Sequence, residues 1–325
     1  MDRRTLLRCV GAGAAAAGIV TGAWAQATSD AAAYPSRNVT LVVPFSAGSM
    51  TDILARSVAD KLTERWKQTV IVENRPGIAG TAGVAKAPAD GYTLMLTSNG
   101  HTVLKAVNPN IAFDPLKDFV AVSQVASTPS ILIVPPDGPM KALKDLVETA
   151  KAKPGALNYS SAGLGSSTGI AAELFKQVTG TNLVVVPHRG LPESQTSVMR
   201  GDVAMAFTFF NVGGDLIQGG KLRALAVTGP KRMSQLPDVP TFTEAGLPAF
   251  AYDSWFGIMA PAGTPKPIVD KISQDVAAAL QAPDMKARFD PQGAELVSST
   301  PERFGEVLRS DTERYGALFP KQPGG

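Results

Sequence analysis

The chain has 325 residues, of which 44% are hydrophobic and 18% charged, and its formal net charge is +3. This length predicts about two domains, and this composition is typical of a globular α/β protein rather than a disordered one. No cluster of Lys and Arg interleaved with aromatic residues indicates nucleic acid as a partner.

Residues 1–25 predict a secretory signal peptide. Arg3 and Arg4 precede an apolar run, 10–23, that is too short to span a membrane, and Ala23-Trp24-Ala25 forms a small-x-small cleavage site. Two arginines this early also resemble a twin-arginine export signal, so the general and twin-arginine routes both stay open. Cleavage after Ala25 removes three arginines and one aspartate, which lowers the formal net charge from +3 to +1.

Cys9 lies inside this leader and is the only cysteine of the chain. The mature protein is therefore expected to have no disulfide and no thiolate metal site. The two histidines, His101 and His188, are too few and too far apart to predict a metal centre, and we expect no cofactor. No second apolar run is long enough to cross a membrane, so we expect a soluble periplasmic protein.

After a flexible segment at 26–33, strand and helix patterns alternate along the chain. In the first half, strands are expected at 39–45, 69–73, 93–97, 121–127 and 131–134, and helices at 51–66 and 81–87. In the second half, strands are expected at 157–160, 183–186, 203–209, 222–227, 252–260 and 295–297, and the main helices at 141–153, 167–178, 267–281 and 301–318. This alternation predicts mostly parallel sheets flanked by helices.

Two turns carry the predicted binding site. Pro44–Asp52 joins the first strand to the first long helix through a glycine turn, and Ser160–Ser167 repeats this arrangement with small hydroxyl residues and glycines. Such turns leave backbone N–H groups free at a helix N-terminus, where the helix dipole favours a negative group such as a carboxylate. Neither turn matches a phosphate loop or a dinucleotide fingerprint.

The candidate ligand-binding residues come from these turns and from the strand ends beside them. The first turn and its flanks supply Phe45, Ser46, Ala47, Gly48, Ser49, Met50 and Asp52. The second turn supplies Ser161, Gly163, Gly165, Ser166, Ser167 and Gly169. Neighbouring strand ends supply Ser98, Asn99, His188 and Phe209.

An exported serine hydrolase is one alternative, because Gly165–Gly169 matches the Gly-x-Ser-x-Gly nucleophile elbow. Ser167 would then need an acid and a histidine later in the chain. The only acid between Ser167 and His188 is Glu173, which lies inside a predicted helix. We therefore predict a binding protein with no catalytic residue.

Motifs along nearly all of the mature chain resemble the extracytoplasmic solute-binding proteins of tripartite tricarboxylate transporters, the Bordetella uptake gene family. The early motifs are Leu41–Phe45, Asp52, Ala55-Arg56, Val72–Gly77, Asp90–Leu94, Phe113–Pro115 and Asp118-Phe119. The later ones are Leu222–Val227, Leu236–Thr241 and Ala260–Pro265.

The resemblance implies a two-domain periplasmic binding protein fold with a hinged ligand cleft between the domains. Domain 1 would comprise 34–135 plus 252–325, and domain 2 would comprise 136–251. It also implies that amides and hydroxyls of the two turns hold a small organic carboxylate without a basic side chain. The protein, expected to be a monomer, would deliver this ligand to a membrane permease; a sensor protein not coupled to transport remains a second alternative.

The chain departs from the family pattern near both turns. Ser49 stands where the family usually has a second glycine, and its hydroxyl is expected to face the pocket. Gly169 stands where histidine is common, and His188-Arg189 stands where the family often has Tyr-Lys. Extra room at Gly169 and the apolar Met50 predict a ligand bulkier or less polar than a small dicarboxylate, such as an aromatic acid.

Overall fold

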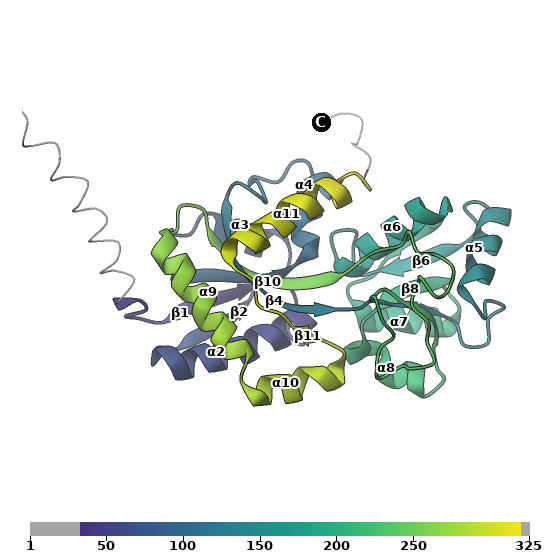
Figure 1. Cartoon of the computed structure of the whole chain (residues 1–325). Coiled ribbons are helices and arrows are strands. Elements are labelled where there is room, and N and C mark those ends of the chain that lie inside the picture. Colours follow the sequence, from purple (N-terminus) through teal and green to yellow (C-terminus); the bar gives the residue numbers. More distant parts are fainter. Residues whose placement is uncertain (1–32, 320–325) are drawn as a thin grey trace, which may run out of the picture.

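A computed structural model describes residues 33–319, so the predicted signal peptide at 1–25 and residues 26–32 lie outside the described residues. The chain forms two lobes, each built on one β-sheet with helices around it (Figure 1). Among residues 33–319, no helix combines the length and the apolar character needed to cross a membrane.

Lobe 1 contains a six-stranded sheet with the order β11-β4-β10-β3-β1-β2. Its strands are β1 (Val39–Val43), β2 (Val70–Asn74), β3 (Thr93–Ser98), β4 (Phe119–Thr128), β10 (Ser254–Pro261) and β11 (Glu295–Leu296). Its helices are α2 (Met50–Trp66), α3 (Ile78–Ala85), α4 (Leu104–Val107), α9 (Lys266–Leu280), α10 (Pro283–Phe289) and α11 (Pro301–Gly316), with 3-10 turns η1 (Asn99–Val103) and η2 (Asp290–Gln292).

Lobe 2 contains a five-stranded sheet with the order β7-β6-β8-β5-β9. Its strands are β5 (Ile131–Val134), β6 (Asn158–Ser161), β7 (Val184–Pro187), β8 (Met205–Thr208) and β9 (Arg223–Val227). Its helices are α5 (Leu143–Ala152), α6 (Ser167–Thr179), α7 (Leu191–Arg200) and α8 (Phe210–Gln218).

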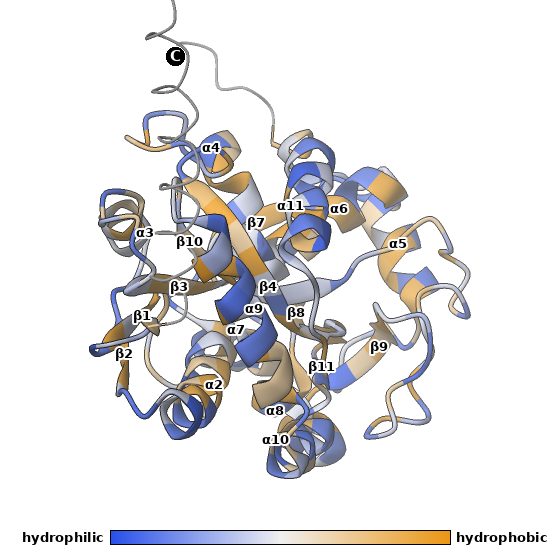
Figure 2. Cartoon of the chain, turned by 60° about the vertical axis from the view of Figure 1, so that its left-hand side comes forward, coloured by the Kyte–Doolittle hydropathy of each residue, from blue (hydrophilic) through white to orange (hydrophobic). Residues whose placement is uncertain are grey.

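Local sequence accounts for these elements, as helix α2 illustrates. Leu54, Val58 and Leu62 recur at helical spacing, and all three are fully buried in the core of lobe 1. Ser49 caps the N-terminus and Lys67, in a left-handed conformation, ends the helix. Within residues 33–319, apolar residues concentrate on strands such as β10, whereas α9 and α10 turn hydrophilic surfaces outward (Figure 2).

The predicted α/β class and two-lobed fold are confirmed, but each sheet is mixed rather than mostly parallel. β1 pairs parallel with β2 and β3, whereas β10 pairs antiparallel with β3 and β4. In lobe 2, β6 pairs parallel with β7 and β8, whereas β5 pairs antiparallel with β8 and β9. In lobe 1 this antiparallel pairing arises because β4 leads the chain out of the lobe and β10 brings it back beside β4, in the opposite direction.

The chain crosses between the lobes at residues 129–130 and again at 251–253. Ser130 Oγ and Ser254 Oγ, one beside each crossing, lie 3.0 Å apart, so the two crossings are adjacent in space. Because β5 pairs with β8 and β9, it lies in lobe 2, although the expected first domain extended to residue 135. We therefore propose that lobe 2 begins near Ser130 and ends near Ala251.

Candidate ligand-binding site between the lobes

The first candidate loop joins β1 to α2. Ser46, Ala47 and Gly48 are exposed, and Gly48 has a φ of 79°, which a residue with a side chain adopts only with strain. Ser49 has an ordinary φ of −67°, and its Oγ accepts the N–H of Asp52 at 3.2 Å. Among the described residues, the first two amides of α2 have no acceptor, so this helix N-terminus can bind an anion.

Asp52 supports this loop from inside the protein. Its carboxylate accepts hydrogen bonds from Gly48 N and Asn74 Nδ2, each at 2.9 Å, and from Arg56 Nε at 3.2 Å. Burial alone would raise the pKa of Asp52, but the donors on Gly48, Arg56 and Asn74 outweigh it and hold the pKa below its usual range. In this ligand-free structure the carboxylate of Asp52, a predicted ligand contact, supports the loop.

The second candidate loop joins β6 to α6 and is held by its own hydroxyl groups. The carbonyl of Gly163 accepts hydrogen bonds from Ser161 Oγ at 2.9 Å and from Ser166 Oγ at 2.7 Å. Ser166 also caps α6, because its Oγ accepts the N–H of Gly169 at 3.1 Å. The first two amides of α6 have no acceptor within 33–319, so the geometry of the first loop is repeated.

Two features that predicted a bulky ligand do not open space for one. A Cβ placed on Gly169 would lie 2.3 Å from the carbonyl oxygen of Gly163, so the loop backbone already fills the room that glycine leaves. Met50 is 5% exposed and packs into the core of lobe 1. The aromatic-acid interpretation therefore loses both residues on which it depended.

A buried network links the lobes beside the second loop. Ser167 Oγ donates to Asn99 Oδ1 at 2.5 Å, while Asn99 Nδ2 donates to the hydroxyl of Tyr252 at 2.8 Å. That hydroxyl in turn donates to the carbonyl oxygen of Ser167 at 2.5 Å. Asn99 and Ser167 were both expected to contact ligand, but in this structure their side chains bind each other.

Apolar side chains also meet across the lobes. Phe209 of lobe 2 is 6% exposed, and its ring packs edge-on against Phe256 of lobe 1, with the centroids 6.2 Å apart. Leu191, at the start of α7, packs against the core of lobe 1, as does the half-buried Phe45. Ser98 is buried at the end of β3, on the lobe 1 side of this contact.

Sequence reasoning missed Leu191 and Tyr252. Leu191 directly follows the Pro187–Gly190 segment, which is similar to a family motif. This position in the sequence is the signal that could have identified Leu191 as a residue of the site. Tyr252 gave no comparable signal, because its role depends on partners 153 and 85 residues away along the chain.

The histidines do not complete a hydrolase site. His188 is half-buried, and its Nδ1 lies 2.9 Å from Ser160 Oγ and 3.0 Å from the carbonyl oxygen of Val186. His101 is buried, and its Nε2 lies 2.8 Å from the carbonyl oxygen of Pro115. Within residues 33–319 neither imidazole contacts Ser167, whose hydroxyl proton goes to an amide oxygen, so this geometry argues against serine catalysis.

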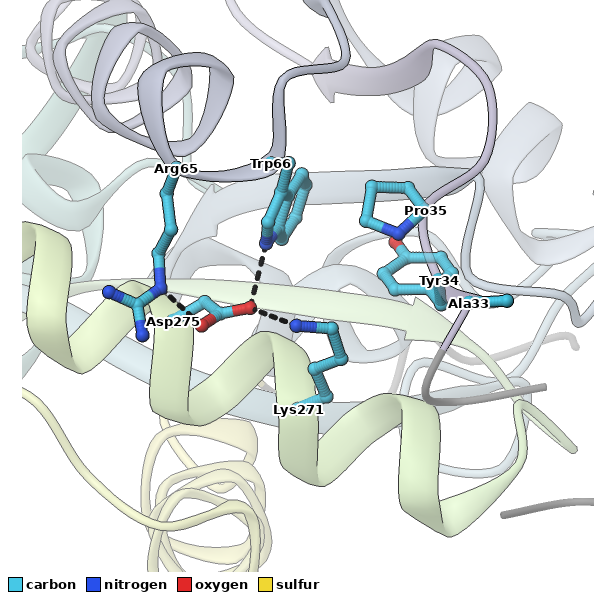
Figure 3. Close-up of a pocket in the computed structure, with 7 residues that line it drawn as sticks. All are labelled: Ala33, Tyr34, Pro35, Arg65, Trp66, Lys271 and Asp275. Atoms are coloured by element: carbon cyan, nitrogen blue, oxygen red, sulfur yellow. Dashed lines mark hydrogen bonds and ion pairs between the residues drawn. The ribbon is translucent and has the colours of Figure 1, made fainter. Parts of the chain in front are cut away.

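Two surface pockets lie outside this site. The first, of about 560 Å³, surrounds Asp275, which accepts hydrogen bonds from Arg65 Nε, Trp66 Nε1 and Lys271 Nζ at 2.5, 2.7 and 2.9 Å (Figure 3). The second, of about 670 Å³, lies between the start of β4, α9 and α11. Both are lined by lobe 1 residues other than the predicted ligand-binding ones. Among the described residues, no group of three His, Cys, Asp or Glu side chains could hold a metal ion.

Comparisons with known proteins agree with this arrangement. The family model described as "Tripartite tricarboxylate transporter family receptor" matches residues 54–322. A protein of Pseudomonas sp. (strain P51), named for the tcbD-tcbE intergenic region, is 36% identical over 291 residues, which are 88% of this chain and 87% of that protein. Protein BugT of Bordetella pertussis is 33% identical over 323 residues, which are 98% of this chain and 97% of BugT.

Solved structures of similar proteins also indicate this family. The periplasmic binding protein BugD has a TM-score of 0.78 at 32% identity, with 88% of this chain and 97% of BugD covered. An R. palustris protein solved with adipate has a TM-score of 0.79 at 34% identity, covering 88% of this chain and 97% of its own. MatC from Rhodopseudomonas palustris, solved with malate, has a TM-score of 0.79 at 30% identity, covering 88% of this chain and all of its own. The chain therefore belongs to the tripartite tricarboxylate transporter receptor family and is a solute-binding receptor.

Proposed function

We propose that this protein binds a small dicarboxylate between its lobes in the periplasm and delivers it to a permease of the tripartite tricarboxylate type. The observation that supports this most is the pair of helix N-termini, α2 from lobe 1 and α6 from lobe 2. Each has two amides without an acceptor among the described residues, and each starts from a loop held by its own side chains. A diacid would bind with one carboxylate at each of these two helix N-termini.

The basic residues near the first loop have other partners, which supports binding by amides and hydroxyls. Arg56 pairs with Asp52 and donates to Asn74 Oδ1 at 3.0 Å. Arg75 pairs with Glu73. Two relatives were solved with adipate and with malate. We therefore propose linear diacids of this size as the ligand, in place of an aromatic acid.

Export and oligomeric state belong to the same proposal. The predicted leader at 1–25, with cleavage after Ala25, would bring the protein to the periplasm by the general or the twin-arginine route. Both loops of the site come from one chain, which supports action as a monomer. Ligand binding would then shift an equilibrium between open and closed lobes that the permease senses.

The first test is thermal unfolding of residues 26–325, unfolded and refolded to release any bound ligand, against a panel of acids. The panel holds malate, adipate, tricarboxylates, aromatic acids and the neutral diamide of each diacid as its matched control. A diacid at 100 times its Kd should stabilise the fold by about 2.7 kcal/mol, a shift of several degrees, and the diamide should not. Absence of a shift with every acid would contradict the proposal.

Transport coupling needs a separate test in the native organism. Deleting the gene should abolish uptake of the diacid found above, and restoring the gene should recover it. Unchanged uptake, together with loss of a response to the same acid, would support the sensor alternative instead.

A further inference from the structure

One segment of lobe 1 reaches into lobe 2. Residues 99–107, which form η1 and α4, follow β3 of lobe 1 directly. Val103, which is fully buried, belongs to the core cluster of lobe 2, and the partly buried Val107 packs against that cluster. The segment therefore lies against the element of lobe 2 that carries the second ligand loop.

The polar side chains at this contact have hydrogen-bond partners for nearly all of their donors and acceptors. Asn99 is fully buried, and its Nδ2 donates to the carbonyl oxygen of Asp253 at 3.3 Å as well as to Tyr252. Ser167 and Tyr252 are 5% and 4% exposed. Because these groups are away from water, removing one member leaves the others without partners, which costs more than one exposed hydrogen bond.

The backbone part of the contact requires glycine. A Cβ placed on Gly100 would lie 2.1 Å from the carbonyl oxygen of Gly165 and 3.1 Å from its carbonyl carbon. Gly100 does not have a left-handed φ, so space and not conformation demands glycine here. Backbone of lobe 1 therefore touches backbone of the second ligand loop directly.

We propose that Asn99, Gly100, Ser167 and Tyr252 form an interlobe latch that holds the lobes in the arrangement of this structure and positions the second ligand loop. The latch joins lobe 1 through Asn99 and Gly100, lobe 2 through Ser167, and the second crossing through Tyr252. Since Ser167 is the first residue of α6, releasing it should also let the first amides of this helix shift from the position in which they would hold a ligand carboxylate. The effect on affinity rests on the proposed function; the effect on how the lobes sit against each other does not.

A wedge at Gly100 tests the backbone contact. In Gly100→Ala the added methyl group should push the lobes apart, so the ligand-free protein should have a larger radius of gyration by small-angle X-ray scattering. Diacid binding, measured by titration calorimetry, should weaken roughly 5- to 30-fold. Gly83→Ala is the matched control in the same lobe: its Cβ would have Arg75 Nη1 as its nearest neighbour, at 3.7 Å, and both values should stay as in the wild type.

Removal of one hydroxyl tests the polar contact. Tyr252→Phe keeps the ring and deletes the hydroxyl that bonds both Asn99 Nδ2 and the Ser167 carbonyl oxygen, so it should enlarge the ligand-free protein and weaken binding in the same direction. Tyr315→Phe is its control, because the Tyr315 ring lies 5.7 Å from that of Tyr252, and among the described residues its hydroxyl takes no part in the bonds that join Asn99, Ser167 and Tyr252. Tyr252→Phe also carries the test if the larger clash in Gly100→Ala prevents folding.

The outcomes separate three cases. A latch predicts that both test variants, and neither control, change the radius of gyration. If the test variants lower the unfolding temperature but keep the wild-type radius and affinity, the contact is merely structural and the latch is wrong. If the radius changes although the wild type binds no diacid, the latch stands and the proposed function fails.

Discussion

His101 is a buried imidazole within the segment that links the lobes. It is 2% exposed, its Nε2 faces the carbonyl oxygen of Pro115, and its ring lies edge-on to Phe119 with centroids 4.9 Å apart. Because Pro115 offers only an acceptor, Nε2 carries a proton. Burial lowers the pKa of His101 to about 4, although the Pro115 carbonyl acts in the opposite direction.

This residue predicts a pH dependence of folding. The unfolded chain takes up a proton at His101 near pH 6.5 while the folded chain stays neutral to about pH 4, so stability falls as the pH drops through this window. The loss should be on the order of 3 kcal/mol. His101→Gln keeps an N–H for Pro115 without titrating, so its urea unfolding should be much less pH-dependent between pH 7 and 4.

The pKa values of Asp52 and Asp275 are lowered from 3.8, so the stability from these carboxylates is lost only below the window. An equal slope in the His101→Gln protein would show that other groups govern the effect.

At the scale of elements, two helix caps allow the effect of capping on stability to be distinguished from an effect on ligand binding. Ser166 caps α6 beside the proposed ligand site, and Thr300 caps α11 by accepting the N–H of Arg303 at 3.2 Å. Each cap contributes about 1 kcal/mol, so Ser166→Ala and Thr300→Ala should lower the unfolding temperature by similar amounts. Of these two capping residues, Ser166 is the one that also donates to the carbonyl of Gly163 in the second loop.

Ser166→Ala should therefore weaken diacid binding roughly fivefold, which corresponds to about 1 kcal/mol, while Thr300→Ala leaves it unchanged. Titration calorimetry on both variants measures this difference. Equal affinities in the two variants would mean that the shape of the second loop does not govern ligand binding.

At the scale of the whole molecule, each lobe completes the core of the other. Val103 and Tyr315 of lobe 1 lie in the core of lobe 2, and Phe209 and Leu191 of lobe 2 pack in the core of lobe 1. Unfolding one lobe would expose apolar surface on the other. The two lobes should therefore unfold together.

Scanning calorimetry of the ligand-free protein should show one transition, with a calorimetric enthalpy close to the van't Hoff enthalpy. Phe209→Leu, which weakens contact between the lobes, should broaden this transition. Phe304→Leu, in a cluster made only of lobe 1 residues, should lower its midpoint without broadening it. Two resolved peaks in the wild type would contradict the prediction.

Local patterns in the sequence determined most of the elements. The strand expected at 131–134 matches β5, the helix expected at 51–66 begins one residue earlier in α2, and Gly180 ends α6 in a left-handed conformation. The two glycine turns could also be found, because a helix start and its cap involve residues only a few positions apart. Side-chain periodicity and capping are properties of neighbouring residues, so they are visible without the fold.

Only the tertiary structure decided how these parts meet. The direction of β10 beside β4 depends on a chain that leaves lobe 1 and returns more than a hundred residues later. Asn99 and Ser167 look like free polar groups until the fold brings them together across 68 residues of sequence, and Gly169 leaves no room because the carbonyl of Gly163 occupies it. Burial and partner choice result from contacts between distant segments, and no local pattern encodes which distant segment arrives.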